Sequence, residues 1–270
     1  MAAHVTAMRP GSSRAIPFPR IALFTDVDGT ILDATERLAI NSGDVVRISR
    51  KVELILASSR TLVELGPVQR RLGITSPMIA ENGAVVSFPP RWRGSLDTKR
   101  QVVVLGDGVS LLRPRVTRCA TEAGVAIADQ RDILPDRGRS LQRRYSICVR
   151  DWDGPSAEHF LELLRLEGLN ASRSGKWITI TSGADKGMGV RTVLERAEQL
   201  GAPFRKTVAI GNASNDQPLL AAADARFAIR NPRTGHHAHL LDLPAVTALR
   251  ASGQRAWREA LTSILANGKP

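Results

Sequence analysis

The chain has 270 residues, of which 43% are hydrophobic and 24% charged, a composition typical of globular proteins. Its 38 Lys and Arg residues outnumber its 26 Asp and Glu residues, so the formal net charge is +12. No apolar run approaches the roughly 20 residues of a membrane-spanning helix, which disfavours a membrane protein. Proteins that bind exposed nucleic-acid bases stack aromatic side chains on them, and this chain has a single tyrosine, which disfavours a nucleic-acid-binding protein.

The N-terminal residues and the cysteines bear on the cellular compartment of the protein. Residues 1–20 carry three arginines and three prolines but no apolar stretch of the kind found in secretory signals. We therefore expect residues 1–19 to be a disordered leader. Cys119 and Cys148 are the only cysteines, lie far apart and match no metal-binding spacing, which is typical of a reducing cytoplasm.

Two acidic residues follow the first predicted strand. Residues 21–24 are wholly apolar and predict a buried parallel strand. Side chains at positions i and i+2 of an extended segment project the same way, so Asp26 and Asp28 can converge on one small volume. Gly29 then lets the backbone turn where a side chain would crowd a ligand. Open α/β sheets bind ligands at the carboxyl ends of their strands, so this segment predicts a ligand site.

Strands and helices continue to alternate after this point. Residues 52–57 predict a second strand, which ends at Ser58, and residues 61–72 predict an amphipathic helix. Two short apolar runs follow at 77–80 and 85–88. The Asn-Gly pair between these runs indicates a tight turn.

A second unit is predicted inside the first. Pro89 and Pro90 mark the point where the chain leaves the first unit. Beyond them we expect strands at 101–105, 144–149, 170–173 and 177–181 and helices at 110–123 and 155–167. This mixture is typical of an α+β domain, so we expect a cap over residues 91–183.

The first unit resumes at residue 184 and completes the predicted core. An amphipathic helix ending near Leu200 is followed by strands at 207–210 and 226–229 with a helix at 216–223 between them, and by elements at 245–249 and 256–265. Residues 20–90 and 184–270 therefore predict an α/β core with a doubly wound, Rossmann-like parallel sheet.

Four short motifs resemble those of the haloacid dehalogenase-like phosphatases. Asp-Val-Asp-Gly-Thr at residues 26–30 resembles the first, and Ser58 at a strand end the second. Lys186 before a helix resembles the third, and Gly-Asn-Ala-Ser-Asn-Asp at 211–216 the fourth. A cap between the second and third motifs is similar to the Cof-like type of this superfamily, which implies an α/β core with an inserted α+β cap.

Within that type, the chain resembles the mannosyl-3-phosphoglycerate phosphatase group. The resemblance rests on the first two motifs, on Pro-Met-Ile-Ala-Glu-Asn-Gly-Ala at residues 77–84 and on Asp-Lys-Gly at 185–187. The group usually reads Gly-Gly-Arg-Phe where this chain reads Ser-Gly-Lys-Trp at 174–177, and Ser-Glu-Pro where it reads Ser-Ile-Cys at 146–148. These departures lie in the predicted cap and concern the identity of the sugar.

The resemblance implies a Mg²⁺-dependent phosphomonoesterase acting on a phosphorylated sugar or a glycosyl-glycerate. Asp26 would be the nucleophile and form an aspartyl-phosphate, and Asp28 would be the general acid and base. Ser58 would hydrogen-bond a phosphoryl oxygen, and Lys186 would offset the negative charge. Further candidates for substrate binding are Thr30, Ser59, Arg60, Asn82, Lys176 and Asn215. Arg60, Lys176, Arg144 and Arg173 could grip a second anionic group such as a glycerate carboxylate, or be solvated surface residues.

The implied Mg²⁺ ligands include one unusual residue. They are the Asp26 carboxylate, the Asp28 carbonyl and the fourth motif, here Asn212 and Asp216. Asn212 stands where the family has Asp, and a neutral amide should weaken Mg²⁺ binding. A second hypothesis follows: a catalytically weak or inactive relative that binds an anionic partner through its basic cap, since residues 91–150 hold 13 basic and 6 acidic residues.

Overall fold

The computed structural model describes residues 19–40, 42–92, 99–134 and 142–267. The predicted leader, residues 1–19, lies outside these ranges except for its last residue. No helix in the described ranges combines the length and apolar composition needed to cross a bilayer.

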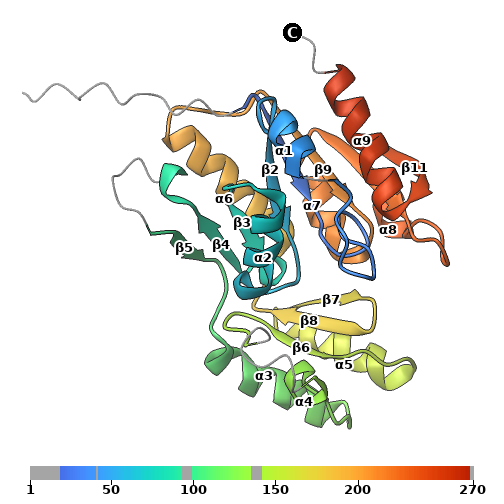
Figure 1. Cartoon of the computed structure of the whole chain (residues 1–270). Coiled ribbons are helices and arrows are strands. Elements are labelled where there is room, and N and C mark those ends of the chain that lie inside the picture. The colour runs from blue at the N-terminus through green and yellow to red at the C-terminus, as the bar shows by residue number, and fades with distance from the viewer. Residues whose placement is uncertain (1–18, 41, 93–98, 135–141, 268–270) are drawn as a thin grey trace, which may run out of the picture.

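The larger of two sheets forms the core (Figure 1). In chain order its described strands are β1 (Ile21–Thr25), β2 (Val52–Ala57), β3 (Met78–Ala80), β4 (Val85–Phe88), β5 (Gln101–Val104), β9 (Lys206–Gly211), β10 (Ala225–Arg230) and β11 (Val246–Ser252). Their spatial order is β11-β10-β9-β1-β2-β3-β4-β5. All neighbours from β11 to β3 are parallel, and β4 and β5 are antiparallel additions at one edge. β1 therefore lies between β9 and β2, with its carboxyl end beside both of theirs.

Helices cover both faces of this sheet. Leu23 of β1 packs in a cluster with residues of α1 (Ser42–Ser49), α2 (Leu62–Leu72) and α9 (Gly253–Asn267). Its neighbours Ala22 and Phe24 point to the other face and pack with α6 (Lys186–Gln199), α7 (Gln217–Ala221) and α8 (Ala238–Leu241). A strand that is buried on both faces has a continuous apolar sequence, as residues 21–24 do. The predicted doubly wound α/β core is confirmed.

The smaller sheet is antiparallel and has the order β6-β8-β7 (Figure 1). Its strands are β6 (Ile147–Arg150), β7 (Asn170–Ser174) and β8 (Trp177–Thr181), accompanied by α3 (Val109–Glu122), α4 (Gln130–Ile133) and α5 (Pro155–Leu166). Ile178 and Ile180 pack in a cluster with residues of α3 and α5. Because strand side chains alternate, Trp177 and Thr179 lie on the opposite face, and both line a cavity shared with the core.

One predicted strand belongs to a different sheet from the one expected. Residues 101–105 were assigned to the cap, and this is wrong for β5, which pairs antiparallel with β4 at the edge of the core sheet. Val103 packs against the core cluster, whereas Val102 and Val104 are exposed, as expected for an edge strand. The separate α+β unit therefore begins after β5.

The turn between β3 and β4 has an unusual backbone. It is the 3₁₀ turn η1 (Glu81–Gly83), in which Glu81 and Asn82 have φ angles of 50° and 54°. Residues other than glycine rarely adopt this left-handed region, and each costs roughly 1–3 kcal/mol. Gly83, with φ 93°, leaves space for the backbone of Asp185, at the start of α6. The predicted Asn-Gly turn thus packs against the helix that begins with Lys186.

Candidate active site

Two carboxylates and one ammonium group form a buried cluster at the centre of the core. Asp26 follows β1, and Asp216 ends the 3₁₀ turn η4 (Ser214–Asp216), which follows β9. These strands are parallel neighbours with Thr25 opposite Ile210, so their carboxyl ends coincide. Lys186 Nζ donates at 2.6 Å to Oδ1 of Asp26 and at 2.6 Å to Oδ1 of Asp216. All three predicted site residues are buried and in contact.

Burial and charge act together on these groups. The pKa of Asp26 is raised to about 7, mainly by burial and then by the Asp216 carboxylate, although Lys186 lowers it. Burial alone would lower the pKa of Lys186, but its contacts with Asp216 and Asp26 outweigh this and raise it. The ionised, nucleophilic form of Asp26 therefore depends on nearby positive charge.

Asp216 holds the loop after β9. Its Oδ2 accepts the backbone N–H of Asn212 at 2.8 Å and that of Ala213 at 3.0 Å, while its Oδ1 accepts Lys186. A Cβ atom on Gly211 would lie only 2.4 Å from the Cβ of Asp216, so this close approach requires glycine. Both oxygens of Asp216 therefore accept hydrogen bonds, and each keeps a lone pair for a further ligand.

Asn212 and the main chain of Asp28 meet beside Asp26. Asn212 Nδ2 donates to the carbonyl oxygen of Asp28 at 3.1 Å. Neighbouring oxygen ligands of an octahedral Mg²⁺ lie roughly 3 Å apart, and an Asn amide can turn its oxygen to the same place. The Asp26 carboxylate accepts Lys186 at its Oδ1. One carboxylate, one carbonyl and one amide thus form a donor set that fits Mg²⁺, with less negative charge than a second carboxylate would bring.

The Asp28 side chain is held by Arg60. Arg60 Nη2 lies 2.5 Å from Asp28 Oδ1, and its Nε lies 3.0 Å from Oδ2. The same guanidinium also contacts Glu36 at 2.7 Å. The Asp28 side chain is 50% exposed and lines a cavity between the core and the cap. Arg60, predicted as a substrate contact, pairs with Asp28 in this arrangement and also lines this cavity.

Ser58 lies at the end of β2 with its hydroxyl group directed by the following turn. Ser58 is buried, its backbone N–H donates to Ile79 O at 3.0 Å, and its Oγ accepts the backbone N–H of Arg60 at 3.2 Å. Its own hydroxyl proton stays available for a ligand oxygen. Thr61 then caps α2 by accepting the N–H of Glu64, as the predicted helix start implies.

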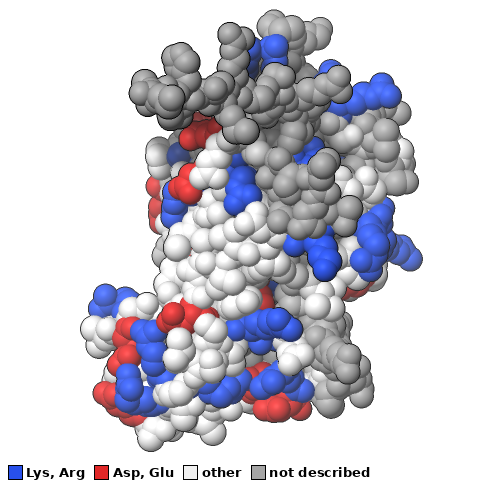
Figure 2. Space-filling model, turned by 90° about the vertical axis from the view of Figure 1, so that its left-hand side faces the viewer, with Lys and Arg blue, Asp and Glu red and all other residues white. Residues whose placement is uncertain are grey.

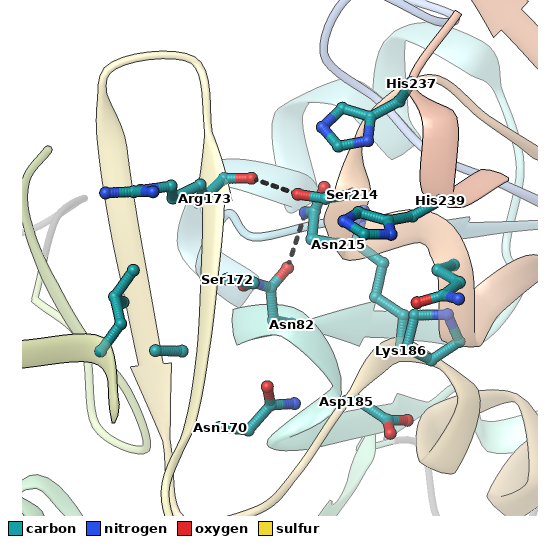
Figure 3. Close-up of a pocket in the computed structure, with 14 residues that line it drawn as sticks. Asn82, Asn170, Ser172, Arg173, Asp185, Lys186, Ser214, Asn215, His237 and His239 are labelled. Atoms are coloured by element: carbon teal, nitrogen blue, oxygen red, sulfur yellow. Dashed lines mark hydrogen bonds between the residues drawn. The ribbon is translucent and has the colours of Figure 1, made fainter. Parts of the chain in front are cut away.

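Asn82 connects the core to the cap, and Asn215 contacts Asn82 within the core. Asn82 Nδ2 donates to Ser172 Oγ at 2.8 Å, and Asn215 Nδ2 donates to Asn82 Oδ1 at 3.1 Å (Figure 3). Both line a cavity of about 460 Å³ on one side of the β7–β8 hairpin. Asn215 Oδ1 and Thr30 Oγ1 are buried and have no hydrogen-bond partner among the described residues.

A larger cavity of about 640 Å³ lies between the core and the cap. The core lines it with Asp28, Ser59, Arg60 and Asn212, among others, and the cap lines it with Arg143, Arg173, Ser174, Trp177 and Thr179. Lys176, predicted to bind substrate, is exposed on the β7–β8 turn and does not line this cavity; its ammonium lies over the Trp177 ring, 5.8 Å from its centroid.

Two residues that the sequence analysis did not single out hold the cap on the core. Glu81 is buried and accepts the backbone N–H of Tyr145 at 3.1 Å and the hydroxyl of Ser146 at 2.7 Å. Arg143 donates to the Ser59 carbonyl at 2.7 Å. The signal for Glu81 was a carboxylate at the end of a buried strand, beside Asn-Gly; nothing marked Arg143 among its neighbouring arginines.

Replacing Gly83 by Ala tests the packing of η1 against α6. The new Cβ would lie 1.8 Å from the Asp185 carbonyl oxygen, at a φ of 93°. Overpacking and backbone strain together should lower the free energy of unfolding by roughly 2–4 kcal/mol, measured by urea denaturation. Gly73→Ala is the control: its φ is 67°, but nothing lies within 4 Å of the added Cβ, so only the strain of about 1–2 kcal/mol applies. Equal losses in both variants would contradict the close contact.

Comparisons with known proteins agree with the motifs. The model of a family described as haloacid dehalogenase-like hydrolases matches residues 23–93 and 157–239. A glucosyl-3-phosphoglycerate/mannosyl-3-phosphoglycerate phosphatase of Persephonella marina is 27% identical over 265 residues, covering 91% of this chain and 97% of that protein. A phosphatase of the same name from Methanococcoides burtonii is 25% identical and covers 90% and 96%. A haloacid dehalogenase-like hydrolase from B. subtilis has a similar fold, with a TM-score of 0.65 at 17% identity, covering 91% and 98%.

Proposed function

Because this chain belongs to the haloacid dehalogenase-like hydrolases, we propose that it is a phosphomonoesterase that acts through a phosphorylated Asp26. The observation that supports this most strongly is the buried contact of Lys186 with both Asp26 and Asp216. Lys186 holds Oδ1 of Asp26, so this oxygen is oriented and Oδ2 is the one that can attack.

The proposed reaction has two steps. Asp26 Oδ2 attacks phosphorus, the bond from phosphorus to the leaving oxygen breaks, and Asp28 gives that oxygen a proton. Asp28 then takes a proton from water, which attacks the phosphorus, so inorganic phosphate leaves and the Asp26 carboxylate is restored. Ser58 and Lys186 hold the phosphoryl oxygens and offset their charge. Before it can act as an acid, Asp28 must be released at least in part from Arg60.

We propose Mg²⁺ as the cofactor. Asp26, the Asp28 carbonyl and Asn212 would hold it, and Asp216 would contribute directly or through water. When bound, it supplies positive charge that reduces the repulsion between Asp26 and a substrate phosphate. Removing metal with EDTA should abolish phosphate release, and excess Mg²⁺ should restore it.

We propose that the substrate is a phosphorylated sugar or a glycosyl-3-phosphoglycerate. The two relatives above are named for glucosyl and mannosyl substrates of the second kind. The 640 Å³ cavity suits such a molecule, because Trp177 offers an aromatic surface and Ser174 and Thr179 add hydroxyl groups around it. Phosphate release from a panel of sugar phosphates and glycosyl-3-phosphoglycerates, with and without Mg²⁺, tests the function. A panel without turnover at any Mg²⁺ concentration would overturn it.

The alternative of an anionic macromolecular partner has little support in the charge distribution. Arg113 pairs with Asp129, and Arg118 pairs with Glu167, so part of the basic excess of residues 91–150 is neutralised. Figure 2 shows basic and acidic side chains interspersed over the lower part of the visible face, without a continuous basic patch there.

We place the reaction in the cytoplasm. Cys119 and Cys148 are both buried free thiols, which suits a reducing compartment.

Replacing Asn212 by Asp should strengthen Mg²⁺ binding. The change adds a charged oxygen beside Asp28 O and should raise the affinity roughly 10-fold or more, because ligand charge governs affinity for hard cations. Titration calorimetry with MgCl₂ measures this directly. Asn231→Asp is the matched control. Asn231 lies on an exposed loop, lines the 640 Å³ cavity that Asn212 also lines, and gains the same charge in the variant. Unchanged affinity in Asn212→Asp would remove this residue from the proposed metal site.

A further inference from the structure

Three arginines line the 640 Å³ cavity, and two of them already have carboxylate partners. Arg60 pairs with Asp28 and Glu36. Arg173 pairs with Asp151 at 3.1 Å and with Glu158 at 2.7 Å. Its guanidinium points away from the Ser214 side of the hairpin in Figure 3. The charges of these two arginines are therefore balanced within the protein.

Arg143 differs because it contacts only neutral acceptors among the described residues. Its Nη1 donates to the Ser59 carbonyl at 2.7 Å and to Ser146 Oγ at 3.2 Å. Its Nε and Nη2 both donate to Gln130 Oε1, at 3.3 and 3.1 Å. A guanidinium has five N–H groups, so one N–H on Nη2 has no acceptor in the described part of the chain.

The carboxylates of the same cavity do not supply the missing charge. Asp28 and Asp151 are held by Arg60 and Arg173. Glu64, which also lines the cavity, accepts the N–H of Thr61 in the cap of α2. Arg143 thus presents a positive charge without an anionic partner to a half-buried cavity whose other wall carries Asp28.

We infer that Arg143 binds a carboxylate of the substrate and so selects phosphorylated glycerate derivatives over neutral sugar phosphates. The inference rests on the proposed function in one respect, because it takes the substrate phosphate to lie beside Asp26. Arg143 donates to the carbonyl of Ser59, which follows Ser58 in the chain, and Arg143 and Asp28 line the same cavity. One molecule could then carry its phosphate at Ser58 and Asp26 and its carboxylate at Arg143. A charge-assisted contact from a rigidly held guanidinium is stronger than one from an exposed, mobile cation.

This assignment differs from the candidates suggested by the sequence. Arg60 and Arg173 are occupied by carboxylates, and Lys176 lies on an exposed turn outside the cavity lining. Arg144 is exposed and is not part of the cavity lining either. Arg143 is therefore the one arginine of the described lining whose charge is left for a ligand.

Two small ligands distinguish the contribution of the carboxylate to binding from that of the phosphate. 3-Phosphoglycerate and glycerol 3-phosphate differ only in a carboxylate that replaces a hydroxymethyl group. Titration calorimetry in an Asp26→Asn background, which prevents turnover, should show that 3-phosphoglycerate binds roughly 10- to 100-fold more tightly. Adding Arg143→Gln should abolish this preference and leave the affinity for glycerol 3-phosphate within a few fold. Arg143→Lys, which keeps the charge, should retain part of the preference.

The control and the outcomes distinguish this inference from the proposed function. Arg165→Ala removes an exposed arginine on α5 that pairs with Glu162 outside the cavity and should leave the preference unchanged. Thermal denaturation of each variant shows whether Arg143→Gln still folds. Equal affinity for the two ligands, no binding of either, or a preference that survives in a folded Arg143→Gln variant would overturn the inference. A carboxylate preference that depends on Arg143, in a protein that releases no phosphate from any substrate, would instead support the inference and overturn the proposed hydrolysis.

Discussion

Replacing Asp26 by Asn is expected to lower the rate of phosphate release by roughly 10⁴-fold or more, because an amide cannot form the acyl-phosphate. The fold should survive. Burial already raises the pKa of Asp26 to about 7, so the protein accepts a neutral group at this position at little cost. Lys186 keeps its contact with Asp216 in the variant. Steady-state assays give the rate, and thermal denaturation should show Tm within a few degrees of the wild type.

Two further measurements make this prediction specific. Asp153→Asn, which changes an exposed carboxylate of the cap, should leave the rate unchanged. Rapid acid quenching with labelled substrate should trap phosphate on the wild-type protein and none on Asp26→Asn. More than about a tenth of the wild-type rate remaining in Asp26→Asn would rule out Asp26 as the nucleophile.

Replacing Lys186 by Met is expected to cost both activity and stability. Met keeps the length of the side chain but leaves Asp26 and Asp216 buried without their shared cation. Removing one partner from a buried ion pair typically lowers the free energy of unfolding by about 3–5 kcal/mol. For a chain of this size, Tm should fall by roughly 10 °C. Urea denaturation followed by the fluorescence of Trp92 and Trp257, which are both buried, measures the loss.

The pH dependence of this loss has a definite sign. Lys186 lowers the pKa of Asp26, so in the variant that pKa should rise above about 7. A carboxyl group whose pKa is higher in the folded than in the unfolded state contributes stability at low pH that is lost as pH rises through the folded value. The deficit of Lys186→Met should therefore be largest at alkaline pH and shrink as the pH falls.

A second substitution shows whether lost charge or lost packing causes the stability loss of Lys186→Met. Asp26→Asn combined with Lys186→Met removes one of the two unpaired carboxylates and should recover part of the lost stability. Lys51→Met, at an exposed lysine, should change stability by less than about 0.5 kcal/mol. No recovery in the double variant would mean that lost packing, not charge, causes the deficit.

The core and its buried cluster could be predicted because their signals are local. The apolar run at β1 followed by Asp26 predicted both the strand and the place of the site. Lys186 was predicted from its motif at a helix start, and the structure brings it to Asp26 across 160 residues. Parallel pairing of β1 and β9 then aligns the segments after the two strands, as open α/β sheets generally do.

The errors and omissions concern contacts between distant segments. Nothing in residues 101–105 indicates which sheet β5 joins, because a short run of valines suits a strand of either sheet, and its pairing with β4 decides. The contact of Arg60 with Asp28 spans 32 residues, so its pairing with this carboxylate could not be predicted from the sequence. Arg143 stands beside Arg144, and only the contacts of the folded chain show that one of the two faces the cavity.

The hydrogen bonds that join cap to core have a kinetic consequence. They include Glu81 with Ser146, Asn82 with Ser172, and Ser59 with Arg143. Each is worth about 0.5–1.5 kcal/mol net, so the three together favour the docked arrangement by about 1.5–4.5 kcal/mol and leave roughly 0.05% to 8% of the molecules undocked. Substrate entry and phosphate exit would wait for that minority, and the maximal turnover rate should fall as solvent viscosity rises.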